Sequence, residues 1–96
     1  MYKPSIIQTK TECFICRQFY NFETLYPLER HHFLHGTGMR QLADADGLWA
    51  WLCVRHHREL HDLNKFDKDL QIIAQRAYIK KHSREEYFKR YGKFYE

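Results

Sequence analysis

Long apolar segments, glycine and proline are all scarce in this sequence of 96 residues. No apolar run approaches the length of about 18 residues that crosses a bilayer. Met1-Tyr2-Lys3-Pro4 does not lead into the apolar stretch of a secretory signal. We therefore expect a cytoplasmic protein that makes no contact with membranes. With 4 glycines, 2 prolines and no visible repeat or linker, the length predicts one domain over residues 1–96.

Cysteine is also sparse, but its number is informative. The chain has 3 cysteines, and an odd number argues against a disulfide scaffold. Histidine, by contrast, occurs 7 times, far above its usual share. A chain of this size buries only about 60–65% of its extended surface, so its core alone is marginal. Cysteine and histidine together therefore indicate bound metal.

The charge of the chain is uneven. The net charge is +4, and residues 76–96 hold seven basic and three acidic side chains, whereas residues 1–75 hold nine of each. A basic C-terminal segment suits a polyanion such as nucleic acid. The alternative is an ordinary solvated helix face, and charge alone does not choose between the two.

The pattern of apolar residues predicts an α+β fold. We expect an arm or a strand at 1–10, extended chain at 25–32 and a strand at 48–54, which is short, apolar and aromatic. The segment 33–47 contains three of the glycines and is interpreted as a loop. A helix is expected to follow the second strand at 55–63, because that segment lacks glycine and proline.

Two further helices are expected at the C-terminal end. Asp67 is a plausible N-cap for a helix over 67–81, which keeps an apolar stripe at helical spacing. Ser83 and Glu86 form a capping-box pattern that opens a short third helix, and Gly92 is expected to close it. The aromatic residues near this helix are expected to pack it on the domain rather than to stack on bases. They are Tyr87, Phe88, Tyr91, Phe94 and Tyr95.

Two pairs of residues share the spacing of a zinc site. Cys13 and Cys16 lie in a predicted tight turn, and Cys53 and His56 repeat the two-residue gap. Zinc in structural sites takes four tetrahedral sulfur and nitrogen ligands, and this Cys₃His set uses every cysteine. Such a site contributes about 10–16 kcal/mol, which offsets a small core. The alternative, a redox Cys-x-x-Cys with one buried cysteine, needs a βαβ surround that the sequence lacks.

A second group of histidines has a different pattern. His31 and His32 are adjacent, so at the end of a strand their side chains point to opposite faces. His57 and His61 are four residues apart, on the same side of the predicted helix. A lone His-x-x-x-His is a weak signal. Combined with the His-His pair, the intervening glycine-containing loop and the Cys₃His frame, it becomes much more specific.

In this order, the motifs resemble the ββα-metal fold of the HNH nucleases. The Glu-x-His-His run at 29–32 and the His-x-x-x-His pair at 57–61 are most similar to the nuclease domains of DNase colicins. The Cys-x-x-Cys and Cys-x-x-His frame is similar to zinc-stapled HNH proteins of phages. The resemblance covers residues 11–62, and the C-terminal helices more loosely. It implies a small ββα-metal domain with a core at about 11–63 and basic helices at about 67–92.

The resemblance also implies a role for each histidine. His31, His57 and His61 match the ligands of one divalent catalytic ion. His32 matches the general base that activates water. Glu29 matches an acidic position that holds a basic or metal-ligating side chain.

The sequence departs from the family at one position. The asparagine that usually orients the base is missing, because no Asn lies between His32 and His57. Asp44 and Asp46 are the nearest polar candidates, and we favour Asp46 as the residue that orients the base. An aspartate can accept a hydrogen bond from His32 and raise its basicity. If neither carboxylate reaches His32, the chain is a weakened nuclease or a binding relic.

The chemistry implied is hydrolysis of a DNA phosphodiester. An imidazole accepts a proton near neutral pH, and a divalent ion stabilises charge on the phosphate and on the leaving oxygen. Arg40, Arg55 and Arg58 are expected to add phosphate contacts. Three imidazoles favour nickel, zinc or cobalt, and magnesium or manganese stay open as the active ion. The resemblance implies 5′-phosphate and 3′-hydroxyl products and an approach to the minor groove.

Two other classes of protein are alternatives. A non-catalytic zinc module that binds nucleic acid or a protein explains the Cys₃His set and the basic tail, but leaves the other four histidines without a purpose. A zinc deaminase uses His-x-Glu together with Pro-Cys-x-x-Cys, and this combination does not occur here. Binding to DNA is expected to be largely electrostatic and therefore to fall with salt.

Overall fold

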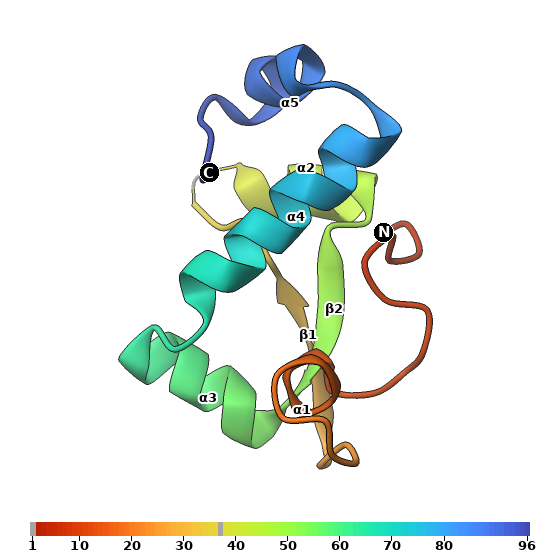
Figure 1. The fold of residues 1–96 in the computed structure, drawn as a ribbon, viewed down its shortest axis with the longest axis vertical. Coiled ribbons are helices and arrows are strands. Elements are labelled where there is room, and N and C mark those ends of the chain that lie inside the picture. The colour runs from red at the N-terminus through yellow and green to blue at the C-terminus, as the bar shows by residue number, and fades with distance from the viewer. Residues whose placement is uncertain (1, 37) are drawn as a thin grey trace.

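The computed structural model describes residues 2–36 and 38–96 and shows a two-stranded antiparallel sheet among short helices (Figure 1). Its elements are α1 (Phe14–Gln18), β1 (Leu28–His32), α2 (Met39–Asp46), β2 (Trp49–Cys53), α3 (Val54–Leu63), α4 (Asp67–Lys81) and α5 (Arg84–Tyr91). The predicted α+β class is confirmed. Met1 and Thr37, which belong to the expected arm and loop, lie outside the described residues. Within residues 2–36 and 38–96, no helix is long and apolar enough to cross a bilayer.

The two strands and the helix after them form one continuous unit. β1 pairs with β2 in a register that sets Leu28 opposite Cys53 and His32 opposite Trp49. β2 then passes directly into α3, since Cys53 is the N-cap and its thiol accepts from the backbone N–H of His56. The predicted order of strand, strand and helix is therefore present, and it sets the first residues of β1 beside the first turns of α3.

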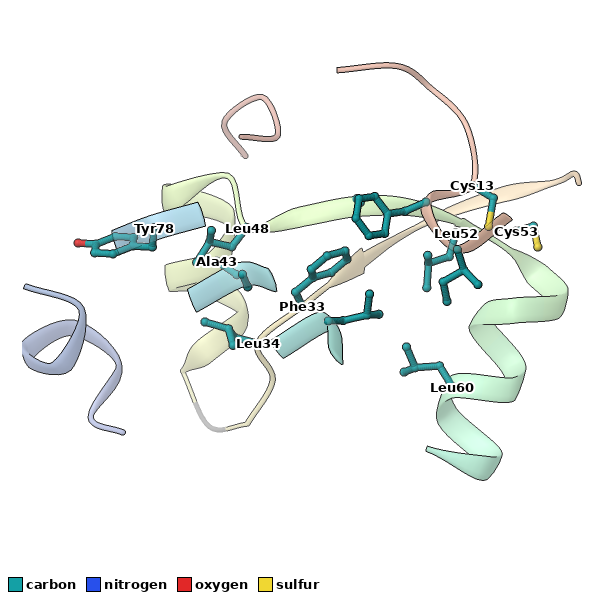
Figure 2. Close-up of a cluster of buried hydrophobic side chains, with 14 of the residues drawn as sticks. Cys13, Phe33, Leu34, Ala43, Leu48, Leu52, Cys53, Leu60 and Tyr78 are labelled. Atoms are coloured by element: carbon teal, nitrogen blue, oxygen red, sulfur yellow. The ribbon is translucent and has the colours of Figure 1, made fainter. Parts of the chain in front are cut away.

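The core fills the space between the sheet and the helices (Figure 2). Figure 2 places Leu52 and Leu60 near one end of the cluster, by α3, and Leu48 and Tyr78 near the other. Phe33, fully buried, lies between the two ends. One apolar cluster thus supports both the cysteine end of the sheet and the end that carries the C-terminal helices.

The segment expected to be a loop at 33–47 contains a helix, so that prediction is wrong over 39–46. The reason is that its glycines flank the helix rather than interrupt it. Gly38 is the N-cap, and Gly47, with a φ of 73°, is a left-handed C-cap whose N–H bonds to the carbonyl of Ala43. A Cβ on Gly47 would also meet the carbonyl oxygen of Pro4 at 2.5 Å. Gly47 therefore ends α2 and lets the N-terminal residues approach.

Residues 2–8, which we term the N-terminal arm, run along β2 and α2 without forming a strand. Ile6 donates to the carbonyl of Gly47 at 2.9 Å, and Lys3 donates to that of Asp44 at 2.9 Å. The indole of Trp49 donates to the carbonyl of Lys3 at 2.8 Å. Of the two alternatives for residues 1–10, the described part is thus an arm, fixed by single hydrogen bonds rather than by a ladder.

The other expected helices form with small differences. The segment between the first two cysteines is the short helix α1 rather than a plain turn. Asp67 is not the N-cap of α4: Phe66, in the left-handed region, precedes the helix, and Asp67 is its first residue. In α5 the prediction is confirmed, because Ser83 accepts from the N–H of Glu86 and Gly92 is the left-handed C-cap. Tyr87 and Tyr91 are buried, whereas Phe88 stays half exposed.

Candidate functional site

The four residues of the predicted zinc set converge at the junction of α1, β2 and α3. Their thiols and ring are all buried, and the Nδ1 of His56 lies 3.7, 3.4 and 3.3 Å from the sulfurs of Cys13, Cys16 and Cys53. The sulfurs of Cys16 and Cys53 are 3.9 Å apart. A tetrahedral zinc ion with ordinary bond lengths sets its ligands about 3.5–3.8 Å apart. The donor set therefore fits zinc.

Local structure explains why these side chains meet. Cys13 and Cys53 each cap a helix, so each following turn brings the residue three positions later, Cys16 or His56, back toward the cap. Burial raises the pKa of Cys16 to about 12, so without a cation this thiol stays protonated. A metal ion reverses that preference, because thiolate is the form that binds it.

Aromatic residues shield the outer side of this cluster. The ring of Tyr20 stacks on the imidazole of His56 with centroids 5.2 Å apart and an interplanar angle of 10°, and Phe22 lies 6.3 Å away. Both aromatic side chains are about two-fifths exposed. They separate the cluster from solvent, as expected of a structural centre rather than a catalytic one, which keeps an open position.

The second group, His31, His57 and His61, also converges as predicted. Each residue offers a ring nitrogen, and these nitrogens lie within 4.8 Å of one another. The Nε2 atoms of His57 and His61 are 3.1 Å apart, which matches two ligands of one ion. His31 is only 4% exposed, and its Nε2 has no partner within the described residues. Because buried polar atoms are normally paired, this nitrogen favours a bound ligand.

The environment of His31 keeps its ring neutral. Burial, assisted by the neighbouring rings of His57 and His61, lowers the pKa of His31 to about 3. A neutral imidazole has a free lone pair, which is the form that ligates a metal. In contrast to the Cys₃His group, this triad combines one buried and two more accessible residues, so an ion held here remains open to water or substrate.

Glu29 fixes the orientation of one triad member. Its Oε1 lies 2.8 Å from the Nδ1 of His57. A carboxylate only accepts, so Nδ1 carries the proton and Nε2 keeps the lone pair that faces His61. Carboxylates of this kind commonly orient metal-ligating histidines. Glu29 thus contacts His57, which is a candidate metal ligand.

His32 lies in the same cleft but belongs to a different contact. Its Nε2 is 2.8 Å from the Oδ1 of Asp44, and the same oxygen accepts from Arg30 at 2.5 Å. Burial acts to raise the pKa of Asp44, but the hydrogen bonds from Arg30 and His32 outweigh it and lower that pKa. The carboxylate therefore stays ionised, accepts from Nε2–H and leaves Nδ1 of His32 as the basic nitrogen.

The preference for Asp46 as the orienting carboxylate is wrong. Asp46 accepts from Arg90 at 2.5 Å and from the hydroxyl of Tyr91, both on α5. Asp44 and Asp46 are two residues apart on α2, so helical geometry turns them about 200° from each other. The structure brings Asp44 to His32 and sends Asp46 to the C-terminal helix.

The cleft at the triad has a volume of about 480 Å³, and five histidines are among the residues that line it. Arg40 lines it, as does Arg30, which the sequence did not single out. Arg55 and Arg58 line another hollow, beside Tyr26. The structure therefore does not place these two arginines at the triad, where they were expected to contact phosphate.

His35 and Asp67 also line the cleft, and sequence analysis missed their pairing. The Nε2 of His35 lies 3.0 Å from Asp67 Oδ1. The two residues are 32 positions apart, and no local spacing links them. The only signal in the sequence is the presence of His35 in the segment between the two histidine motifs.

Comparisons with protein-family models, with curated proteins and with solved structures find no match to this chain. The features of the chain that bear on function are the two metal-compatible clusters and the cleft between β1, α2, α3 and the start of α4.

Proposed function

We propose that this protein is a metal-dependent endonuclease of the HNH type, which hydrolyses phosphodiester bonds in DNA. The observation that carries the proposal is that two adjacent histidines contact different partners. His31 turns toward His57 and His61, while His32 turns toward Asp44, and both line one cleft. A binding module has no need of a metal-compatible triad beside an oriented imidazole.

The residues of the cleft supply the parts of a hydrolytic reaction. Nδ1 of His32 takes a proton from a water molecule, whose oxygen forms a bond to phosphorus. Asp44 holds the opposite ring nitrogen and stabilises the imidazolium that results. The bond from phosphorus to the 3′ oxygen breaks, and that oxygen gains a proton, which leaves 5′-phosphate and 3′-hydroxyl ends.

His31, His57 and His61 would hold the divalent ion of this reaction. When bound, such an ion supplies Lewis-acid stabilisation of charge on the phosphate and on the leaving oxygen. Glu29 keeps His57 in the tautomer that this role needs. The Cys₃His cluster has a separate role, which is to join α1 to the start of α3 and so to fix the helix that carries two of the three ligands.

Charge supports DNA as the substrate. The chain carries a formal charge of +4, and the cleft presents Arg40 beside the histidines. Arg76 and Arg90 pair with acidic residues, whereas Lys80, Lys81, Arg84 and Lys93 make no ion pair within the described residues. Lys80 and Lys81 line a different hollow from the histidines. Cations without an acidic partner nevertheless attract the phosphate backbone of a nucleic acid.

A plasmid-nicking assay across magnesium, manganese, nickel and zinc tests the proposal. We expect wild-type protein to nick the plasmid and His32→Ala to lose activity by about 10²–10⁴-fold while it binds both metal equivalents. His82→Ala serves as a matched control, since His82 stacks on Tyr78 and belongs to neither cluster. Cleavage by His32→Ala at the wild-type rate would refute the assignment. Zinc binding without any cleavage by wild type would support a non-catalytic zinc module instead.

A further inference from the structure

We propose that Arg30 is a positioning residue, which holds Asp44 against His32 and is itself held in place by the N-terminal arm. This inference rests on the proposed nuclease function and adds a part to its active site. It concerns a residue of β1 that lies between Glu29 and His31 and that no motif identified.

The contacts of Arg30 and His32 meet on one atom. Arg30 and His32 both donate to Oδ1 of Asp44, at 2.5 and 2.8 Å. The three side chains are between 20% and 29% exposed, so the group is partly screened from water. Because Arg30 and His32 are two residues apart on β1, their side chains lie on the same face of the strand, and both hold the carboxylate of Asp44.

Aromatic rings fix the guanidinium. The centroid of the Tyr2 ring lies 3.5 Å from the Cζ of Arg30, and that of Trp49 lies 4.6 Å from it. Such cation–π contacts restrict a long side chain that otherwise samples many rotamers. Tyr2 also packs edge-on against Trp49 at 5.0 Å. The arm therefore contributes a ring that covers the cation.

The arm contacts the orienting residue as well. Lys3 donates to the backbone carbonyl of Asp44, and the indole of Trp49 donates to the carbonyl of Lys3. Ser5 donates to the carbonyl of Trp49 at 2.5 Å. One short segment thus holds the backbone of Asp44 and the ring that packs on Arg30. Its position determines where the carboxylate lies.

The contacts of Arg30 with Asp44, Tyr2 and Trp49 come with a cost in folding free energy. The Nε of Arg30 is buried and has no partner within the described part of the chain. A buried donor without a partner costs folding free energy. A side chain that carries this cost, at the back of a candidate active site, fits a functional role better than a purely structural one.

The first experiment separates positioning from substrate binding. We expect Arg30→Met to lower kcat by about 10-fold or more, with KM within about twofold, because the loss falls on the base rather than on DNA binding. Arg30→Lys should recover part of kcat, since an ammonium retains the charge but not the planar fork. A rise in KM with unchanged kcat would show that Arg30 binds phosphate directly and would overturn the proposal. Arg17→Met is the control, because Arg17 pairs with Glu12 and lies outside the histidine cleft.

A double-mutant cycle tests whether Arg30 acts through Asp44. In an Asp44→Asn background, Arg30→Met should cost less than about twofold in kcat, because residues that act as a unit are not additive. Additive losses would overturn the proposal. If Arg30→Met does not fold, Tyr2→Ala tests the arm instead. It should lower kcat less strongly and be restored by Tyr2→Phe, whereas full activity of Tyr2→Ala would contradict the role of the arm.

Nitrogen NMR of the imidazoles provides a readout that does not need catalysis. We expect His32 in wild type to be the Nε2–H tautomer, and Arg30→Met to reduce the population of this tautomer. Arg17→Met should leave it unchanged. An unaltered tautomer in Arg30→Met would refute the positioning role even if the enzyme is active. A shifted tautomer without any cleavage by wild type would instead count against the proposed function alone.

Discussion

Glu29 Oε1 lies 2.8 Å from the Nδ1 of His57, although 28 positions separate the two residues in the chain. The contact spans from β1 to α3 and turns the other nitrogen of His57 toward His61. It connects the strand that carries His31 with the helix that carries the other two candidate ligands. A substitution at Glu29 therefore tests the triad without altering any candidate ligand.

Replacing Glu29 by Gln should weaken metal binding at the triad. A neutral amide orients His57 less firmly and makes it less basic, so we expect a loss of about 10–100-fold in affinity. Titration calorimetry with nickel or cobalt on zinc-loaded protein measures this. The control is Glu23→Gln, a residue for which the structure shows no ion pair within the described chain. Equal affinity of wild type and Glu29→Gln would contradict the orienting role of Glu29, and the absence of nickel or cobalt binding by wild type would contradict the triad as a metal site.

Loss of the structural zinc should unfold the protein. Zinc in a Cys₃His site contributes about 10–16 kcal/mol, which is as much as the net stability of about 5–15 kcal/mol of a typical domain. We expect Cys16→Ser, or a strong chelator, to remove the cooperative thermal transition seen by circular dichroism. His82→Ala should keep it. A chelated protein that still melts cooperatively at the same temperature would show that the cluster does not hold zinc.

The two aspartates of α2 should have separable effects. Asp46→Asn loses its charged contacts to Arg90 and Tyr91, and should cost about 1–3 kcal/mol of stability while folded protein keeps its kcat. Asp44→Asn should lower kcat with a smaller change in stability. Urea unfolding and nicking kinetics on both variants provide the comparison. The reverse pattern, with catalysis lost only in Asp46→Asn, would restore the sequence-based choice of that residue.

Alkaline pH should destabilise the C-terminal helix through Tyr87. Burial raises the pKa of Tyr87, and the charge of Tyr95 adds to the rise. Because the folded pKa exceeds the unfolded value of about 10, the stabilising contribution is complete below pH 10 and is lost as the pH rises beyond it.

Tyr87→Phe should reduce this dependence on pH. Its hydroxyl is buried without a partner within the described residues, so its removal should also stabilise the protein by about 1 kcal/mol at pH 7. Urea unfolding at pH 7 and 10.5 measures both effects. An equally steep alkaline loss in Tyr87→Phe would assign the dependence to other groups.

DNA binding should depend on Arg40 more than on Arg55. Arg40 lines the histidine cleft, whereas Arg55 lines a separate hollow. Arg40→Ala should weaken binding and reduce the slope of log K against log salt by about 1. Arg55→Ala serves as the matched variant, with a smaller effect. Fluorescence anisotropy with a short duplex checks both, and a larger effect of Arg55→Ala would move the binding surface to the other face of α3.

Local spacing accounts for what the sequence predicted well. Cys-x-x-Cys, Cys-x-x-His and His-x-x-x-His are fixed by one or two turns of helix, so each of these pairs follows from short-range geometry, whereas the meeting of the pairs, and of His31 with His57 and His61, depends on the fold. The choice between Asp44 and Asp46 did not follow from local spacing. Both lie on α2, which the sequence did not predict because Gly38 and Gly47 lie directly at its two ends. Once α2 is known to be helical, the opposite directions of the two carboxylates follow at once.

Long-range packing accounts for what the sequence did not reveal. Arg30 and Tyr2 meet through the path of the arm over β2, and His35 meets Asp67 through the placement of α4. Neither pairing has a spacing that could be recognised in one chain. Such contacts depend on the complete fold, and this explains why residues that support the site were harder to find than residues that form it.

The adjacency of His56 and His57 on the first turn of α3 has a consequence for how such a chain can change. One neighbour belongs to the sulfur-rich centre and the other to the imidazole centre, separated by a rotation of about 100°. An insertion or deletion of a single amino acid at this point would swing one centre away from its remaining donors. Substitutions elsewhere do not alter the angle between His56 and His57. Insertions and deletions are therefore expected to accumulate in the connecting segments and not at this turn.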